Sequence, residues 1–175
     1  MILSFSTQLN GKPTYFPEKI LTGLEERQII SFDQTEELFK TAIISKKGIC
    51  HRIEFSGHII INPKLHTIRE DKNNRWQVGN KIDFFINARQ KNMFRFAPVL
   101  PVVSIQEIEI KWLKNKEKKI WWYLGATISI NNVYLSATQC EQLAINDGFD
   151  SVIEFFEYFN KDFHGKIIHW TDLKY

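Results

Sequence analysis

The chain has little cysteine, glycine or proline, and these shortages exclude several kinds of protein. Its 175 residues include two cysteines, Cys50 and Cys140, which are too few for a disulfide framework and lie in no paired metal-binding spacing. The isolated Gly125 and Gly148 leave no glycine-rich phosphate loop. No repeat, low-complexity tract or Gly/Ser linker divides the sequence, so we expect one domain over residues 1–175.

Long apolar runs and strong net charge are also missing. No window approaches the ~18 consecutive apolar residues of a membrane span. The opening stretch "MILSFSTQLNGK" lacks the basic-then-apolar order of a secretion signal. We therefore expect a soluble, cytoplasmic protein that makes no membrane contact. The net charge of only +3 excludes a global field that attracts polyanions, so any contact with nucleic acid must be local.

The chain is instead rich in aromatic and aliphatic side chains. Hydrophobic residues make up 43% of it and aromatic residues 14%, and phenylalanine alone occurs 14 times. A chain of this length can bury a sizeable core. The composition argues against disorder and is typical of a globular protein with a ring-rich sheet.

Short strands dominate the predicted secondary structure. Alternating or continuous apolar runs predict strands within residues 2–6, 50–55, 57–61, 81–88, 94–110, 120–136 and 166–170. The pair Asn131-Asn132 is typical of a tight hairpin turn. Pro98 and Pro101 would interrupt a central ladder, so we expect a bend or an edge there.

A few helices separate these strands. Helical spacing and start signals predict helices within 15–26 and 33–43, then from Ser136 to Gly148, and finally from Ser151 onward. The expected capping pairs are Asp33 with Glu36, Ser136 with Gln139, and Ser151 with Glu154. Many short strands with flanking helices predict an α+β fold built on a small β-barrel.

Four motifs in a fixed order resemble the ASCH family of the PUA-like superfamily. They are "FPEKILTG" (16–23), "KLHTIR" (64–69), "RWQVGNKIDFF" (75–85) and "LAINDGFDSVIEFFEYF" (143–159). In that family a helix ending in a small residue and Gly precedes a Thr-x-Arg element, a polar loop, a Gly turn and a barrel strand. The resemblance implies a small PUA-like β-barrel with peripheral helices, here with an inserted segment at residues 24–63.

Within that family the pattern is most similar to small bacterial amidohydrolases that act on acetylated cytidine. The resemblance carries their Lys, Thr and Glu onto Lys64, Thr67 and Asp147, the last one methylene shorter than Glu. A threonine hydroxyl needs a neighbouring base, and a lysine is one only when burial or a cation such as Arg69 lowers its pKa. Asp147 would orient the ammonium or move the proton. The alternative is that Lys64 is a solvated turn residue and Thr67 an ordinary strand residue.

The same segment also predicts ligand contacts without chemistry. In an extended strand Thr67 and Arg69 share a face, and the planar guanidinium of Arg69 can grip a phosphate or a carbonyl. Trp76, next to Arg75 in the following loop, either stacks on a base or covers the barrel end. His66 points to the other face, where it packs, caps or contacts a ligand.

A second basic stretch, "KWLKNKEKKIWW" (111–122), interleaves lysine and tryptophan. This composition is typical of nucleic-acid contacts, with cations for phosphates and rings for bases. We single out Lys114, Lys116 and Trp121 as candidate contacts. The alternative is a solvated hairpin tip between strands whose tryptophans point inward.

Three functional hypotheses follow from these motifs. The first is a protein that binds RNA or a modified nucleoside in a polar cleft at the barrel mouth. The second is an amidohydrolase that removes an acyl group from a nucleobase amine. The third is a non-catalytic structural or partner-binding protein. None of them calls for a metal or another cofactor, and the sequence leaves the oligomeric state open.

Overall fold

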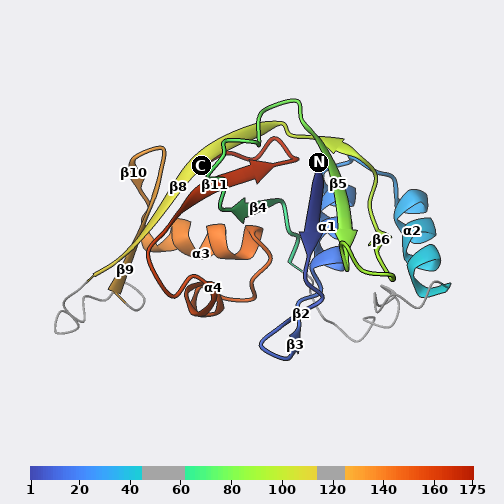
Figure 1. Cartoon of the computed structure of the whole chain (residues 1–175), viewed down its shortest axis with the longest axis horizontal. Coiled ribbons are helices and arrows are strands. Elements are labelled where there is room, and N and C mark those ends of the chain that lie inside the picture. The colour runs from blue at the N-terminus through green and yellow to red at the C-terminus, as the bar shows by residue number, and fades with distance from the viewer. Residues whose placement is uncertain (45–61, 114–124) are drawn as a thin grey trace. The chain divides into compact units, whose positions relative to one another are not determined.

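The computed structural model describes residues 1–44, 62–113 and 125–175 (Figure 1). The chain divides into two compact units, each made of two segments. Unit 1 comprises Met1–Leu65 and Asn80–Pro101, and unit 2 comprises His66–Gly79 and Val102–Tyr175. Every sheet lies within one unit.

Unit 1 is built around one central strand. Its elements are β1 (Ile2–Phe5), β2 (Gln8–Leu9), β3 (Lys12–Pro13), α1 (Phe16–Glu26), α2 (Phe32–Ile44), β5 (Lys81–Ile86), β6 (Phe94–Arg95) and β7 (Leu100–Pro101). Strand β5 pairs parallel with β1 and antiparallel with β6 and β7, while β2 and β3 form a separate hairpin. In β5 every second side chain is buried, so this strand has the alternation of a one-faced core strand.

Three phenylalanines hold the core of unit 1 together. The Phe5 and Phe84 rings stack with centroids 5.9 Å apart, and Phe96 meets both of them edge-on. Such offset and edge-to-face pairs add to the free energy gained by burial. They join β1 and β5 to the segment that follows β6.

Helix α1 holds the segment that leads out of unit 1. The Lys64 N–H donates to the carbonyl of Lys19 at 3.0 Å. A Cβ on Gly23 would come 2.9 Å from Leu65 Cδ2 and 3.0 Å from the Lys64 carbonyl oxygen. A Cβ here would force Leu65 and the Lys64 carbonyl to shift, so the glycine that ends "FPEKILTG" suits this close approach. The predicted helix is confirmed, with a proline in its first turn.

The predicted start of helix α2 was wrong by two residues. Its capping box is formed by Ser31 and Gln34, with the Ser31 N–H donating to Gln34 Oε1 at 2.9 Å and the Gln34 N–H donating to Ser31 Oγ at 3.2 Å. This pair fits the same spacing pattern as Asp33 and Glu36, but lies earlier in the chain and starts the helix at Phe32.

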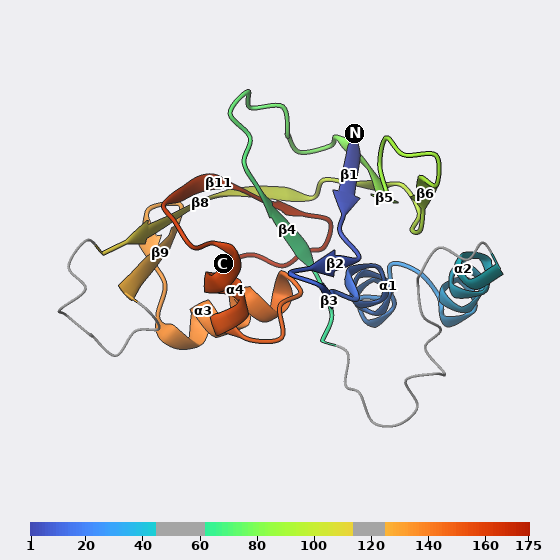
Figure 2. The ribbon, with the colours of Figure 1, turned by 60° about the horizontal axis from the view of Figure 1, so that its bottom comes forward.

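Unit 2 is a five-stranded antiparallel sheet with two helices. Its elements are β4 (His66–Arg69), β8 (Ser104–Trp112), β9 (Ala126–Ile130), β10 (Val133–Tyr134), α3 (Ala137–Asn146), α4 (Val152–Tyr158) and β11 (Phe163–His169). The strand order is β10-β9-β8-β11-β4. Figure 2 shows α3 and α4 along one face of this sheet, as does the view in Figure 1.

Local signals in unit 2 are confirmed. Asn131 and Asn132 adopt positive φ between β9 and β10, as the hairpin turn requires. Ser136 and Gln139 form a complete capping box at α3, and Gly148 has φ +92° just past its end. Ser151 caps α4 by accepting the Glu154 N–H.

The predicted small β-barrel was wrong. Across the described ranges the sheets are open, and β10 and β4 form the two free ends of the larger one. The fold is mixed α/β with several open sheets and, among the described residues, four helices. Alternating apolar residues show that one face of a strand is buried. The same pattern occurs in an open sheet and in a barrel, so it does not distinguish them.

Two other results concern the limits of the described residues. The predicted strands at 50–55 and 57–61, and the start of the 120–136 run, lie outside them. Within the described ranges, no helix has both the length and the apolar character needed to cross a bilayer.

Candidate functional site

Strand β4 places the "HTIR" residues at the edge of the sheet in unit 2. Its register against β11 sets His66 opposite His169, Thr67 opposite Ile168 and Arg69 opposite Lys166. Directly opposed side chains share a face, and neighbours along a strand alternate. Thr67 and Arg69 therefore lie on one face and His66 on the other, as the alternation predicts.

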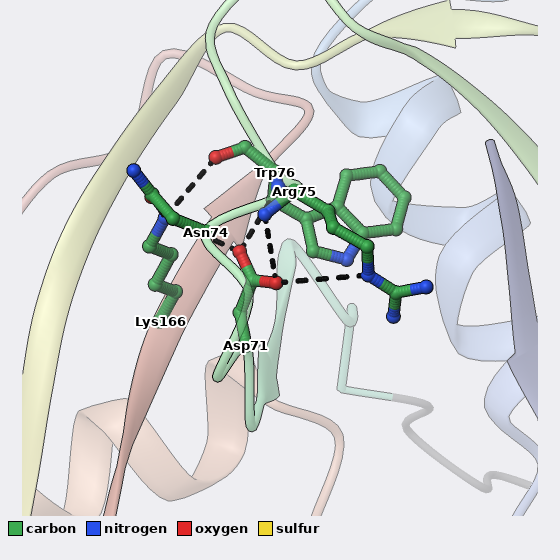
Figure 3. A network of polar contacts seen from close by, with 5 residues as sticks. All are labelled: Asp71, Asn74, Arg75, Trp76 and Lys166. Carbon is green, nitrogen blue, oxygen red and sulfur yellow. Dashed lines mark hydrogen bonds and ion pairs between the residues drawn. The ribbon is translucent and has the colours of Figure 1, made fainter.

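A buried carboxylate organises the loop that follows β4. The Asp71 side chain is only 1% exposed and accepts hydrogen bonds from the backbone N–H groups of Arg75, at 3.0 Å, and Trp76, at 2.9 Å. Lys166 Nζ, from β11, lies 3.2 Å from Asp71 Oδ2. Figure 3 shows these contacts converging on the one carboxylate.

The pKa of Asp71 reports this environment. Burial alone would raise it, but the N–H groups of Trp76 and Arg75 and the ammonium of Lys166 together lower it below the ordinary value. Lys166 also donates to the Trp76 carbonyl at 3.2 Å and to Asn74 Oδ1. We call residues 70–76, held in this way, the Asp71 loop.

The Asp71 loop presents polar and cationic side chains to solvent. Lys72, Asn73, Asn74 and Arg75 are exposed. The Arg75 side chain is 66% exposed, with its Nε 4.0 Å from Asp71 Oδ1. Trp76, in contrast, is 5% exposed, so its indole packs inside the protein and presents no ring to a base.

On the opposite face of the sheet His66 belongs to a polar cluster. Its Nε2 lies 2.7 Å from the Tyr175 hydroxyl, which accepts a hydrogen bond from Asn146 Nδ2 at 2.8 Å. His66 Nδ1 lies 3.5 Å from Asp147 Oδ1.

Asp147 also accepts the Ile68 N–H at 3.2 Å and so occupies the open edge of β4. Beside this cluster lies a cross-strand row of Ser104, His169 and His66. Burial, together with electrostatic repulsion of its protonated form by His66 and Lys174, lowers the pKa of His169 to about 3. His169 is therefore neutral near pH 7.

The residues of the predicted catalytic trio are divided between the two units. Lys64 belongs to unit 1, is 2% exposed, and has its Nζ 4.8 Å from the centroid of the Phe16 ring. Thr67 and Asp147 belong to unit 2. Thr67 points to the face of β4 opposite to His66, whose ring contacts Asp147. Catalysis by this trio stays a prediction.

The predicted contacts Lys114, Lys116 and Trp121 lie outside the described residues. They stay predictions as well.

Sequence reasoning missed three residues of these sites, Asp71, Lys166 and Tyr175. Asp71 precedes the turn-forming pair Asn73-Asn74, so a buried turn-capping role could have been inferred from local sequence. Lys166 and Tyr175 reach the same segment from far along the chain, and no local signal indicates their contacts.

The chain's likeness to known proteins was tested in three ways. Comparison with protein-family models, with curated proteins and with solved structures finds no match. The resemblance to the ASCH family therefore rests on the quoted motifs alone.

Proposed function

We propose that this chain binds RNA, or a nucleotide derived from it, through the Asp71 loop and the neighbouring face of the sheet. The observation that carries the proposal is the anchoring of the Arg75 backbone to the buried Asp71 carboxylate, with the Arg75 guanidinium left in solvent. A cation on a backbone that is already fixed loses less conformational freedom when it binds a phosphate.

The local charge balance supports the same proposal. Arg69 and Lys166 are directly opposed across β4 and β11, an arrangement of like charges that is unfavourable without a counterion. Asp71 neutralises Lys166. With Lys72 and Arg75 the cluster contains four cations against the carboxylates of Glu70, Asp71 and Glu107, the last directly opposite Lys166 on β8, an excess of one positive charge.

Guanidinium groups suit this role because their planar donors match phosphate oxygens. The exposed amides of Asn73 and Asn74 add neutral donors and acceptors beside them. The small overall net charge means that binding through this cluster would be local and not a property of the whole surface.

Titration of a labelled single-stranded RNA tests the proposal. Arg69→Ala and Arg75→Ala should each weaken the affinity by about threefold to tenfold, because each variant removes one guanidinium that binds phosphate. Lys161→Ala is the matched control, because Lys161 is an exposed cation of the same unit that lies outside both the Asp71 loop and the basic stretch 111–122. If both arginine variants bind RNA as the wild type does, the proposal is rejected.

A further inference from the structure

Tyr175 is held on the helix-covered face of the sheet in unit 2 by recognition of its backbone. Gln106 Nε2 donates to the Tyr175 carbonyl oxygen at 2.7 Å, and Gln106 Oε1 accepts the Tyr175 N–H at 3.0 Å. The Gln106 amide therefore binds a donor and an acceptor that lie side by side, the N–H and the carbonyl oxygen of Tyr175. Glutamine reads the edge of a nucleobase with the same pair of contacts.

The far end of Tyr175 meets a second set of polar groups. Its hydroxyl contacts His66 and Asn146, and the His66 ring lies edge-on to the phenol with centroids 5.4 Å apart. Gln142 fixes the Asn146 amide by donating to its Oδ1 at 3.0 Å. The space that Tyr175 fills thus has polar groups at both ends and an aromatic wall.

Near Tyr175 lie more buried polar groups than its single hydroxyl can hydrogen-bond. The His169 ring is 0% exposed, and its centroid lies 6.1 Å from that of Tyr175. Within the described part of the chain, neither ring nitrogen of His169 nor the Oγ of its cross-strand neighbour Ser104 has a hydrogen-bond partner. Buried groups of this kind cost stability and commonly mark a functional site.

We propose that Tyr175 fills a binding slot for a flat heterocycle with an amide edge, of the purine type, and that such a ligand displaces it. The lactam edge of the ring, an N–H beside a C=O, takes the place of the Tyr175 backbone at Gln106. The ring nitrogens at the other end face Asn146, His66 and His169.

The connection to Tyr175 allows this exchange. Residues 171–175 form no helix or strand, and Asp172 and Lys174 are exposed. Tyr175 competes with the ligand for the slot. The apparent affinity of the wild type for the ligand is therefore that of the open slot, lowered in proportion to the small fraction of molecules in which Tyr175 has left it. The slot lies on the face of the sheet opposite to Arg69 and Lys166, so it stands apart from the proposed RNA contacts.

Calorimetric titration with inosine, an uncharged lactam nucleoside, tests the proposal. Tyr175→Ala should bind inosine at least about tenfold more tightly than the wild type, because without the phenol and its contacts with His66 and Asn146 residue 175 leaves Gln106 more readily. Adding Gln106→Ala to that variant should abolish the gain. Lys174→Ala, which changes an exposed neighbour, should bind like the wild type, and so should Arg75→Ala, because inosine has no phosphate.

A folded Tyr175→Ala protein with no gain in inosine affinity would overturn the proposal. So would stabilisation of that variant by p-cresol and not by inosine, because the space would then be only a tyrosine socket. If Tyr175→Ala does not fold, Tyr175→Phe keeps the ring and removes only the hydroxyl that meets His66 and Asn146. It should bind inosine more tightly than the wild type, and an unchanged affinity would equally reject the slot.

Discussion

The ammonium of Lys166 lies 3.2 Å from the carboxylate of Asp71, which is almost completely shielded from solvent. This contact ties a loop to the strand next to the edge of the sheet. It also places a cation beside Arg69 without leaving the two positive charges uncompensated. The conformation of the Asp71 loop, the local balance of charge and the position of the Arg75 backbone therefore all depend on the Asp71 carboxylate.

Replacing that carboxylate should loosen the loop. Asp71→Asn keeps the side-chain shape but removes the charge that Lys166 faces, and we expect the free energy of unfolding to fall by about 1–3 kcal/mol. Urea denaturation measures this change. Glu70→Gln, at an exposed neighbouring carboxylate, is the control and should have little effect. Equal stability of wild type and Asp71→Asn would show that the loop does not depend on Asp71.

Acid should have the same effect as that substitution. The pKa of Asp71 is lower in the folded protein than in the unfolded chain, so its contribution to stability is complete above the ordinary value of 3.8. It is lost as the pH falls through the lowered pKa. The difference in unfolding free energy between wild type and Asp71→Asn should therefore shrink in that acid range, and a difference that persists there would contradict the assignment.

His169 should make stability depend on pH over a higher range. Its pKa is about 3 in the folded protein and 6.5 in the unfolded chain, so between these values the unfolded state binds a proton that the folded state excludes. Stability contributed in this way is present above pH 6.5 and falls as the pH drops toward 3, by up to about 1.4 kcal/mol per pH unit.

Urea denaturation at a series of pH values in this window measures the effect. His169→Leu should have the smaller pH dependence, whatever its absolute stability. Identical slopes for the two proteins would mean that His169 is not the group that excludes the proton.

Gly165 should tolerate no side chain. A Cβ at this position would lie 2.5 Å from the Arg69 carbonyl oxygen and 2.7 Å from the Phe163 ring. Gly165→Ala should therefore push β4 away from β11 and lower the unfolding free energy by about 1–3 kcal/mol. His164→Ala, at the exposed neighbouring position, serves as the control in thermal and urea unfolding. A Gly165→Ala protein as stable as the control would contradict the pairing of β4 with β11.

The sequence predicted what short-range chemistry decides. The capping box of Ser136 and Gln139, the turn at Asn131-Asn132 and the stop at Gly148 each depend on residues within a few positions of one another. The alternation of Thr67 and Arg69 followed from strand geometry alone.

The sequence did not predict what depends on long-range pairing. The contacts of Lys166 with Asp71 and of Tyr175 with His66 join residues far apart in the chain, and they exist only once β11 lies beside β4. The barrel was predicted from alternation that an open sheet satisfies equally well. The burial of Trp76 follows from the position of the whole loop on the sheet, which no local pattern encodes.

The salt dependence of RNA binding tests the central claim most directly. Each phosphate contact that a protein makes releases counterions, so the logarithm of the affinity falls with the logarithm of the salt concentration. If Arg75 on the Asp71 loop contacts a phosphate, Arg75→Ala should reduce that slope by about one, while Lys161→Ala, at an exposed cation outside both basic segments, leaves it unchanged. A wild-type protein that binds no RNA, or an Arg75→Ala protein with the wild-type slope, would contradict the account.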